Sequence, residues 1–543
     1  MNRRPKISQL RALTISTVLT LSIATAHAQT PSLLYSFDPI TEGVFGPFPQ
    51  SVMAQGPDGN LYGSTDTGGA NSFGGVFMVT PSGAETKLHD FTSAEGTHCN
   101  MGLTLGKDGN FYGACYDGGT NNEGELYRIT PTGVFTILYS FTNLNGDGAS
   151  PNAPPIQASD GNFYGGTIGG GAHGDGVIYK MTPAGAVTIV HSLTYPAEGG
   201  SIGGALLQGA DGNLYGTTEE GAGVFRFTTS GRYTVLHAFS TSDGQVPLGA
   251  LIQGADGNFY GTTSLGGSAG DGTVFRITPA GAFTVLHNFD PTVDGQGDPW
   301  NGLVQASNGS YYGASFRSGL SAQNPYGGLF QLTSKGTYSS LYLFDGTVGA
   351  NPSSSLIQHT NGLLYGNTQN QASFNGGSIY SLNIGAKSFC SLLNNSGSVG
   401  ASTAILGQGF TSSSVVKFGG VQAISVAVSG SGFLTAVVPS AALTGPVTVT
   451  TSASTLISKQ VFHVAPTLTA FSPTSGPVGT PVTINGSGLT QTTKVVFNGV
   501  SAAVTINSDT QVTVTVPSGA ISGKIAIVTK GGSAISTKNF TVD

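Results

Sequence analysis

A six-residue motif recurs seven times in this chain at nearly regular intervals. It reads DGNLYG or DGNFYG in five copies and NGSYYG or NGLLYG in the other two. The copies begin at Asp58, Asp108, Asp160, Asp211, Asp256, Asn308 and Asn361, which places 45 to 53 residues between successive starts. Internal repetition at this period indicates a repeat architecture in which each copy forms one supersecondary unit.

Each copy predicts four short strands. In the fifth copy, between Gly249 and Phe289, they read ALIQG, NFYGTT, TVFRIT and FTVLHNF. Asp-Gly or Asn-Gly between β-prone segments predicts a type I′ hairpin turn, and Thr-Pro-x-Gly predicts the turn between the third and fourth strands. A calcium loop is the alternative for Asp-Gly-Asn, but calcium requires several converging oxygens, and two copies lack the aspartate. We therefore interpret these motifs as turns.

Seven four-stranded units predict an all-β fold, with a seven-bladed β-propeller over residues 29–384. An open solenoid is the alternative arrangement. The segment LLYSF at residues 33–37 matches the fourth strand of later copies, whereas the seventh copy lacks such a strand after SIYSLNIG at residue 378. We therefore expect residues 33–37 to pair beside residues 378–383 and to close the ring, which would remove an open sheet edge.

The pattern GLxQGxDGNLYGTT…GxVFxxTPxG…LxxF resembles the GloVer tandem-repeat family over about residues 32–384. That resemblance implies an exported bacterial repeat protein, often with variable anchoring modules, and it implies no known reaction. After Gly385 two segments align at an offset of 79, which predicts two β-sandwiches at residues 385–465 and 466–543. FSPTSGPVGTPVTINGSGL from Phe471 looks like an IPT/TIG domain of immunoglobulin-like fold. The first segment departs from it, because LLNN replaces FSPT.

The first 28 residues resemble a cleavable signal peptide, with cleavage expected after Ala28. Four basic residues precede an uncharged apolar run, and AHA supplies the small-x-small cleavage pattern. Removing this segment removes four of the 20 basic residues and no acidic one, so the mature chain carries 16 against 27, a net charge of −11. That charge disfavours nucleic acid or an anionic membrane as a partner. We expect a secreted, periplasmic or cell-surface protein without a transmembrane segment.

Three cysteines cannot all pair within one chain. Cys99 and Cys115 flank the turn at Asp108, but in hairpin register Cys115 faces Gly102, so a bridge requires the chain to bend back. An oxidising compartment favours the bridge, and the sequence alone leaves both outcomes open. Cys390 would remain free and buried.

The residues that break the repeat offer few candidates for chemistry. The acidic departures are Asp117, Glu123, Glu125, Glu219 and Glu220. Adjacent carboxylates on a strand point to opposite faces, so Glu219 and Glu220 cannot form a glycosidase pair by themselves. His89, His191, His237 and His287 share one place in the fourth strand, where other copies have tyrosine, and this interchange indicates packing with a polar tip rather than metal binding.

Trp300, the only tryptophan, lies in a connecting segment, where it could stack on a sugar ring or pack beneath the loop. It is the one ligand-binding residue that the sequence suggests, and no catalytic residue, metal site or cofactor site is predicted. We expect a non-enzymatic binding or adhesion protein, with the propeller as recognition head for a carbohydrate or a surface protein and the sandwiches as a stalk. The alternatives are an extracellular polysaccharide hydrolase or lyase, and a purely structural envelope protein.

Overall fold

The computed structural model describes residues 29–38, 52–221, 223–228, 230–317, 326–370, 372–374 and 376–543. The expected signal peptide and its cleavage site lie outside these ranges. Within them the regular secondary structure is almost all β-strand, and the single described helix, α1 (Pro291–Asp294), has one turn. No described helix is long and apolar enough to cross a membrane.

Seven antiparallel sheets occupy the described part of residues 32–382. Their strands lie side by side in sequence order, except that the N-terminal strand takes the place of the fourth strand in the last sheet. We number them repeat sheets 1 to 7 by the copy of the motif that each contains. Their strands are β2 (Ala54–Gln55), β3 (Leu61–Thr65), β4 (Gly75–Val79) and β5 (Glu85–Asp90) in sheet 1; β6 (Thr104–Leu105), β7 (Phe111–Cys115), β8 (Glu125–Ile129) and β9 (Phe135–Ser140) in sheet 2; and β11 (Ile156–Gln157), β12 (Phe163–Gly166), β14 (Val177–Met181) and β15 (Val187–Ser192) in sheet 3.

The remaining repeat sheets follow the same order. Their strands are β17 (Leu207–Gln208), β18 (Leu214–Glu220), β19 (Gly223–Phe227) and β20 (Tyr233–Ala238) in sheet 4, to which β16 (Gly200–Ile202) is added; β21 (Ile252–Gln253), β22 (Phe259–Thr263), β23 (Thr273–Ile277) and β24 (Phe283–Asn288) in sheet 5; β25 (Val304–Gln305), β26 (Tyr311–Ser315), β27 (Gly328–Leu332) and β28 (Tyr338–Leu343) in sheet 6; and β29 (Ile357–Gln358), β30 (Leu364–Thr368), β31 (Ser378–Leu382) and β1 (Ser32–Ser36) in sheet 7. A separate pair is formed by β10 (Gly148–Ala149) and β13 (Gly169–Gly170).

The N-terminal strand joins the last repeat sheet. β1 pairs antiparallel with β31, from Ser32 opposite Ser381 to Ser36 opposite Ser378, so the expected pairing of residues 33–37 is confirmed. Phe37 then packs in one hydrophobic cluster with residues of both sheet 1 and sheet 7. The last repeat sheet is therefore joined to the N-terminal strand and packs against the first repeat sheet.

The carboxylate of the motif organises its turn. In the first copy Asp58 accepts hydrogen bonds from the backbone N–H of Asn60 (3.1 Å), from its side-chain amide (2.6 Å) and from the Tyr62 hydroxyl (2.8 Å). The same three bonds recur at Asp108, Asp160, Asp211 and Asp256. These contacts explain the letters D, N and Y.

The two glycines of the motif meet different needs. Gly59 has φ +83°, which side chains disfavour, and it closes the turn by donating its N–H to the Gly56 carbonyl (3.0 Å). A Cβ on Gly63 would lie 2.6 Å from the Phe77 ring, so the final glycine makes room for the aromatic residue of the third strand. The expected type I′ turn is wrong: three residues lie within the loop, and only Gly59 among them has positive φ. This is the type I turn followed by a left-handed glycine.

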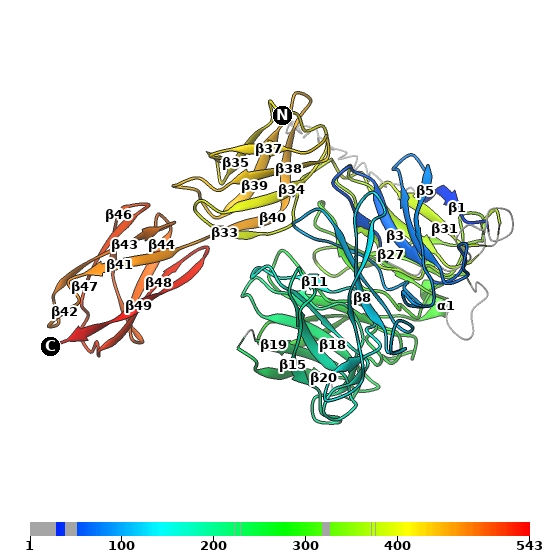
Figure 1. Ribbon diagram of the computed structural model, residues 1–543, viewed down its shortest axis with the longest axis horizontal. Helices are drawn as coiled ribbons and strands as arrows, with labels where there is room; N and C mark the ends of the chain where they lie inside the picture. The colour runs from blue at the N-terminus through cyan, green and yellow to red at the C-terminus, as the bar shows by residue number, and fades with distance from the viewer. Residues whose placement is uncertain are drawn as a thin grey trace, which may run out of the picture.

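The C-terminal region contains two further units, each of two sheets. The first unit has β32 (Ser391–Leu392), β34 (Ser402–Leu406), β38 (Phe433–Val437) and β37 (Val426–Val428) in one sheet, and β33 (Ser396–Ser398), β40 (Thr455–Ala465), β39 (Gly445–Thr450), β35 (Val415–Phe418) and β36 (Val421–Gln422) in the other. The second has β41 (Thr467–Ser472), β43 (Pro481–Ser487), β47 (Gln511–Thr515) and β46 (Val504–Ser508), with β42 (Ser475–Gly476), β49 (Gly532–Val542), β48 (Gly523–Thr529), β44 (Thr492–Phe497) and β45 (Val500–Ala502). Figure 1 shows the two units in a row beside the repeat sheets.

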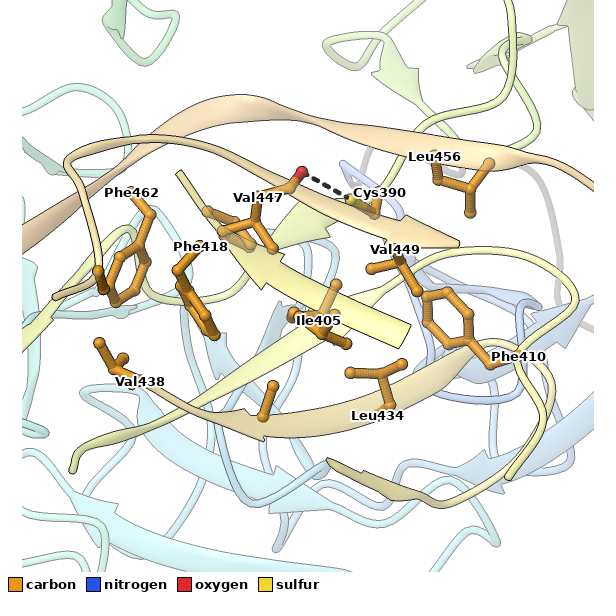
Figure 2. Packing of buried hydrophobic residues seen from close by; sticks show 14 of the residues in the cluster. Cys390, Ile405, Phe410, Phe418, Leu434, Val438, Val447, Val449, Leu456 and Phe462 are labelled. Atoms are coloured by element: carbon orange, nitrogen blue, oxygen red, sulfur yellow. Dashed lines mark hydrogen bonds between the residues drawn. The ribbon is translucent and has the colours of Figure 1, made fainter. Parts of the chain in front are cut away.

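Each unit encloses its own hydrophobic core between its two sheets. In the first unit, Ile405 and Leu434 of one sheet face Phe418 and Val449 of the other (Figure 2). Cys390 is buried in this core as a free thiol, and its sulfur contacts the Val447 carbonyl oxygen at 3.8 Å. The same order of strands in both units matches the offset of 79 residues seen in the sequence.

Candidate functional site

The order of strands gives the repeat sheets two different faces. Because consecutive strands are antiparallel, the turns between strands one and two and between three and four lie at one end of each sheet. We call this end the turn face. The loops between strands two and three, and the linkers that lead to the next sheet, lie at the other end, which we call the linker face.

The turn face is held by a repeated glutamine. In sheet 5, Gln253 accepts a hydrogen bond from the backbone N–H of Ala210 in the preceding turn (2.9 Å) and donates to the Gly257 carbonyl in its own turn (2.9 Å). Equivalent bonds to a neighbouring turn are made by Gln157, Gln208, Gln305 and Gln358. Gln55 of sheet 1 bonds in the same way to the N–H of Thr360 in sheet 7 (2.9 Å), across 305 residues of sequence.

The junction between sheets 1 and 2 lacks this glutamine contact, and the first two-sheet unit packs against it. Pro57 occupies the turn position that donates the N–H elsewhere, and Leu105 stands where the accepting glutamine would be. A proline has no N–H to donate, so an apolar partner is the matching choice. Leu105 packs instead against Leu406 and Phe433 of the first two-sheet unit.

Sheet 7 supplies a polar contact to the same unit. The Thr360 hydroxyl donates to the Gly407 carbonyl (3.1 Å) and accepts from the Gln408 amide (2.8 Å). His359 contacts the Gly59 carbonyl at 2.8 Å, so the turns of sheets 1 and 7 are joined as well. Part of the turn face is therefore occupied by the protein itself.

The linker face has a recurring strained position. Six described linkers carry a non-glycine residue with φ between +52° and +59°, namely His98, Ser150, Ser201, Val246, Asp298 and Asn351. In five of them the carbonyl of this residue accepts the N–H of a residue one or two positions after strand two, at 3.0–3.2 Å. Left-handed non-glycine residues cost free energy and cluster at binding sites. The backbone here is constant while the side chain changes from copy to copy.

Trp300 lies in this region, beside one of the strained residues. Its ring stacks on Phe316 with centroids 3.9 Å apart and an interplanar angle of 8°. The indole N–H donates to Asp298 (2.7 Å), which also pairs with Arg317 (3.1 Å). Burial raises the pKa of the Asp298 carboxyl, although Trp300 and Arg317 oppose the shift. One face of the half-buried Trp300 ring is therefore covered by Phe316, and the Arg317 guanidinium lies 5.6 Å from the ring centroid.

Large apolar side chains are also exposed on the loops and linkers of this face. Val293 is 80% exposed at the helix of the linker between sheets 5 and 6. Leu144, Tyr195, Leu265 and Phe374 are further exposed members of this set. Exposed apolar residues that share one face indicate an interaction surface more strongly than scattered ones.

The sequence-predicted acidic residues have local partners. Asp117 contacts His98 (3.2 Å), and Glu219 accepts from the Asn152 amide (3.3 Å). Glu125 is fully buried and accepts from the Ser140 hydroxyl (2.6 Å), and its other oxygen has no hydrogen-bond partner in the described structure. Desolvation raises the pKa of both Glu125 and Glu219. Glu125 therefore belongs to sheet 2, where Asp117 follows strand β7, and Glu219 belongs to sheet 4, and each carboxylate has a neighbouring side chain as its partner.

The repeated histidines pack as their interchange with tyrosine indicates. His287 stacks on Tyr338 of the next sheet, with centroids 3.7 Å apart, and contacts Asp294 at 2.9 Å. His89, His191 and His237 have the same type of aromatic and carboxylate neighbours. Among the described residues there is no group of three or more His, Cys, Asp or Glu able to hold a metal ion.

The disulfide left open by the sequence is present in the structure between Cys99 and Cys115, and both side chains are buried. Cys99 follows the strained His98, and Cys115 ends β7, so the bridge ties a linker to sheet 2. Sequence reasoning missed the strained linker positions, because their residues share no side-chain type. Aligning the linkers of all copies is the comparison that could have located these positions.

Comparison with known proteins matches residues 17–297 and the last unit to described families. A profile described as the Gloeobacter/Verrucomicrobia repeat matches residues 17–154 and 143–297, and the IPT/TIG domain matches residues 466–542. No curated protein sequence matches the chain.

Solved structures resemble the chain only distantly. A streptogramin B lyase structure is 15% identical over 65% of this chain and 97% of that one, with a TM-score of 0.45. Virginiamycin B lyase from Staphylococcus aureus is 15% identical over 64% and 98%, with a TM-score of 0.45. A fungal alcohol oxidase of the AA5 family is 13% identical over 95% and 100%, with a TM-score of 0.43. Similarity at this level carries no information about activity.

Proposed function

Because this chain belongs to the Gloeobacter/Verrucomicrobia repeat family and ends in an IPT/TIG domain, we propose that it is an exported, non-enzymatic binding protein. In this proposal the repeat sheets are the blades of a seven-bladed β-propeller that acts as the recognition head. The first two-sheet unit is a second immunoglobulin-like domain, and both units form a stalk. Export is supported by the signal-like first 28 residues and by the disulfide between Cys99 and Cys115.

The observation that carries the proposal is the contrast between the two faces. On the turn face five copies repeat the same aspartate and tyrosine contacts and six repeat the glutamine contact, so these residues are accounted for by contacts that stabilise the fold. On the linker face the backbone repeats but the side chains differ, from His98 through Val246 to Asp298. Residues that change while the scaffold stays constant are the ones available for recognition.

The ligand that best suits this face is a neutral saccharide or a surface protein. Charged residues make up only 9% of the chain, and four of the six strained linker positions carry serine, asparagine or valine rather than an ionisable residue. The exposed Val293, Leu144 and Tyr195 supply apolar contacts of the kind used in both classes of complex. Trp300 is half-buried, with Phe316 against one face of its ring, and it is the one aromatic ring that the sequence suggests for stacking on a sugar.

A glycan array probed with residues 29–543 tests this function, with release of reducing ends assayed on every glycan that binds. We expect saturable binding without release. The variant Trp300→Phe keeps an aromatic ring against Phe316 but loses the indole N–H that bonds Asp298, so weaker binding by this variant would assign Trp300 to the site. Release of sugar ends would instead establish the hydrolase or lyase alternative, and absence of any binding to glycans or surface proteins would support a purely structural role.

A further inference from the structure

A second candidate site lies on the turn face, where the first two-sheet unit approaches repeat sheets 5 and 6. A cavity of about 570 Å³ is enclosed there by three segments: residues 305–309 with Ala255, the connector at residues 385–389, and residues 455–459 of β40. It is separate from the linker face and does not depend on the function proposed for that face.

The charged residues of the cavity lining are all basic. Lys387 comes from the connector and Lys459 from β40, and the lining contains no aspartate or glutamate. Both side chains are accessible, and neither takes part in an ion pair among the described residues.

The repeat itself is altered in the turn that lines this cavity. Five copies have aspartate at this turn position, but Asn308 replaces it in sheet 6. The tyrosine contact survives with its direction reversed, since the Asn308 amide donates to the Tyr312 hydroxyl at 2.9 Å. Folding therefore accepts either residue here, and the difference that matters in the cavity is the missing negative charge.

The third strand of sheet 6 also differs from its counterparts in the other copies. Sheets 2 to 5 have a cation on the third strand opposite the motif tyrosine, and in sheet 3 this cation, Lys180, contacts Asp160 at 3.2 Å. Sheet 6 has the neutral Gln331 instead, whose amide donates to the Tyr312 hydroxyl at 3.2 Å. The aspartate and its compensating cation are both absent from this copy, so the two lysines from outside the repeat face no local carboxylate.

We propose that this cavity binds an anionic saccharide through Lys387 and Lys459. The lysine ammonium groups would pair with a carboxylate or sulfate group. The Ser307 hydroxyl, which accepts from the Gln358 amide, keeps its proton to donate to a sugar hydroxyl, and the Ser388 hydroxyl, which donates to the Asn361 carbonyl, can still accept one. Ile457, which is 55% exposed, gives an apolar wall. Because the mature chain is otherwise acidic, the cavity is a local exception to its overall repulsion of anions.

Isothermal titration calorimetry of residues 29–543 tests this site with three probes: an oligogalacturonate, its methyl ester as the neutral match, and a sulfated oligosaccharide. We expect enthalpic binding of at least one anionic probe, weakening with added salt, and no binding of the ester at this cavity. Preference between the two anionic probes identifies the acidic group. Equal binding of the ester, or no binding of either anion, would overturn the proposal.

Three variants separate the cavity from general charge effects. Asn308→Asp restores the residue of five other copies, and we expect it to weaken the anion about tenfold, as we expect for Lys387→Gln. The matched control is Lys494→Gln in the second two-sheet unit, which makes the same change in net charge at an exposed position outside the cavity. Unchanged affinity in Asn308→Asp, or an equal loss in the control, would contradict the assignment.

Discussion

The glutamine contacts between repeat sheets make a quantitative prediction at Gln253. Its side chain joins two turns through bonds of 2.9 Å to the Ala210 N–H and 2.9 Å to the Gly257 carbonyl. A net contribution of about 1 kcal/mol for each bond gives a loss of about 2 kcal/mol in the free energy of unfolding for Gln253→Leu. The native pair Pro57 and Leu105 shows which second change should add no further loss.

Ala210→Pro alone removes the N–H and leaves the glutamine oxygen without its donor, at a cost of about 1 kcal/mol. The turn accepts proline at this position, because Pro57 occupies it in sheet 1. In the double variant, proline and leucine reproduce the native exception. Both single changes remove the same bond between residues 210 and 253, so its loss contributes only once to the free energy of unfolding of the double variant. We therefore expect the double variant to lose about 2 kcal/mol, where independent effects would give about 3 kcal/mol.

Urea denaturation of residues 29–543, followed by the fluorescence of Trp300, measures this cycle. Trp300 is the only tryptophan, so the signal reports on the repeat sheets rather than on the C-terminal units. A coupling of about 1 kcal/mol between positions 210 and 253 is the expected result. Strictly additive losses would refute the explanation of the Pro57 and Leu105 pair.

Three other predictions follow from the same structure. Burial raises the pKa of Glu125 above its ordinary value of 4.5, so the free energy of unfolding should fall as the pH rises above 4.5 towards the raised value, and Glu125→Gln should abolish that part of the pH dependence in urea denaturation. Joint replacement of Cys99 and Cys115 by alanine opens a bridge with a sequence separation of 16 and should cost about 3 kcal/mol, with a reductant lowering the wild-type midpoint but not that of the variant. Deletion of residues 29–37 leaves β31 as an open edge and should produce concentration-dependent association in light scattering, whereas a stable monomer would show that β1 does not protect this edge.

The sequence predicts the repeated part of this fold well, because each strand is bounded by turn residues with a strong local preference. β22 (Phe259–Thr263) falls within the expected NFYGTT segment, and β1 pairs with β31 as expected. The turn type was wrong because strand register, which local sequence does not specify, sets the number of loop residues. A single hydrogen-bonded pair at Gly56 and Asn60 changes a two-residue loop to a three-residue loop.

Features that depend on two copies at once were harder to predict. The match between Pro57 and Leu105 spans two repeats, and neither residue is unusual by itself. The left-handed linker positions are set by bonds of the backbone to neighbouring strands, so their side chains carry no common signal. Glu125 stands out in the sequence as a departure from the repeat, but its contact with Ser140 is set by the register of β8 against β9.

The assignment of recognition to the linker face is tested most directly by two matched triple variants. One replaces Leu144, Tyr195 and Val293 with serine on the linker face. The other replaces Val134, Ile424 and Ile521, which are similarly exposed elsewhere, with serine. Both variants and the parent chain are measured against the same glycan and surface-protein arrays. We predict that the linker-face variant loses binding while the second variant keeps it. Full binding by the linker-face variant, or equal loss in both, would contradict the account.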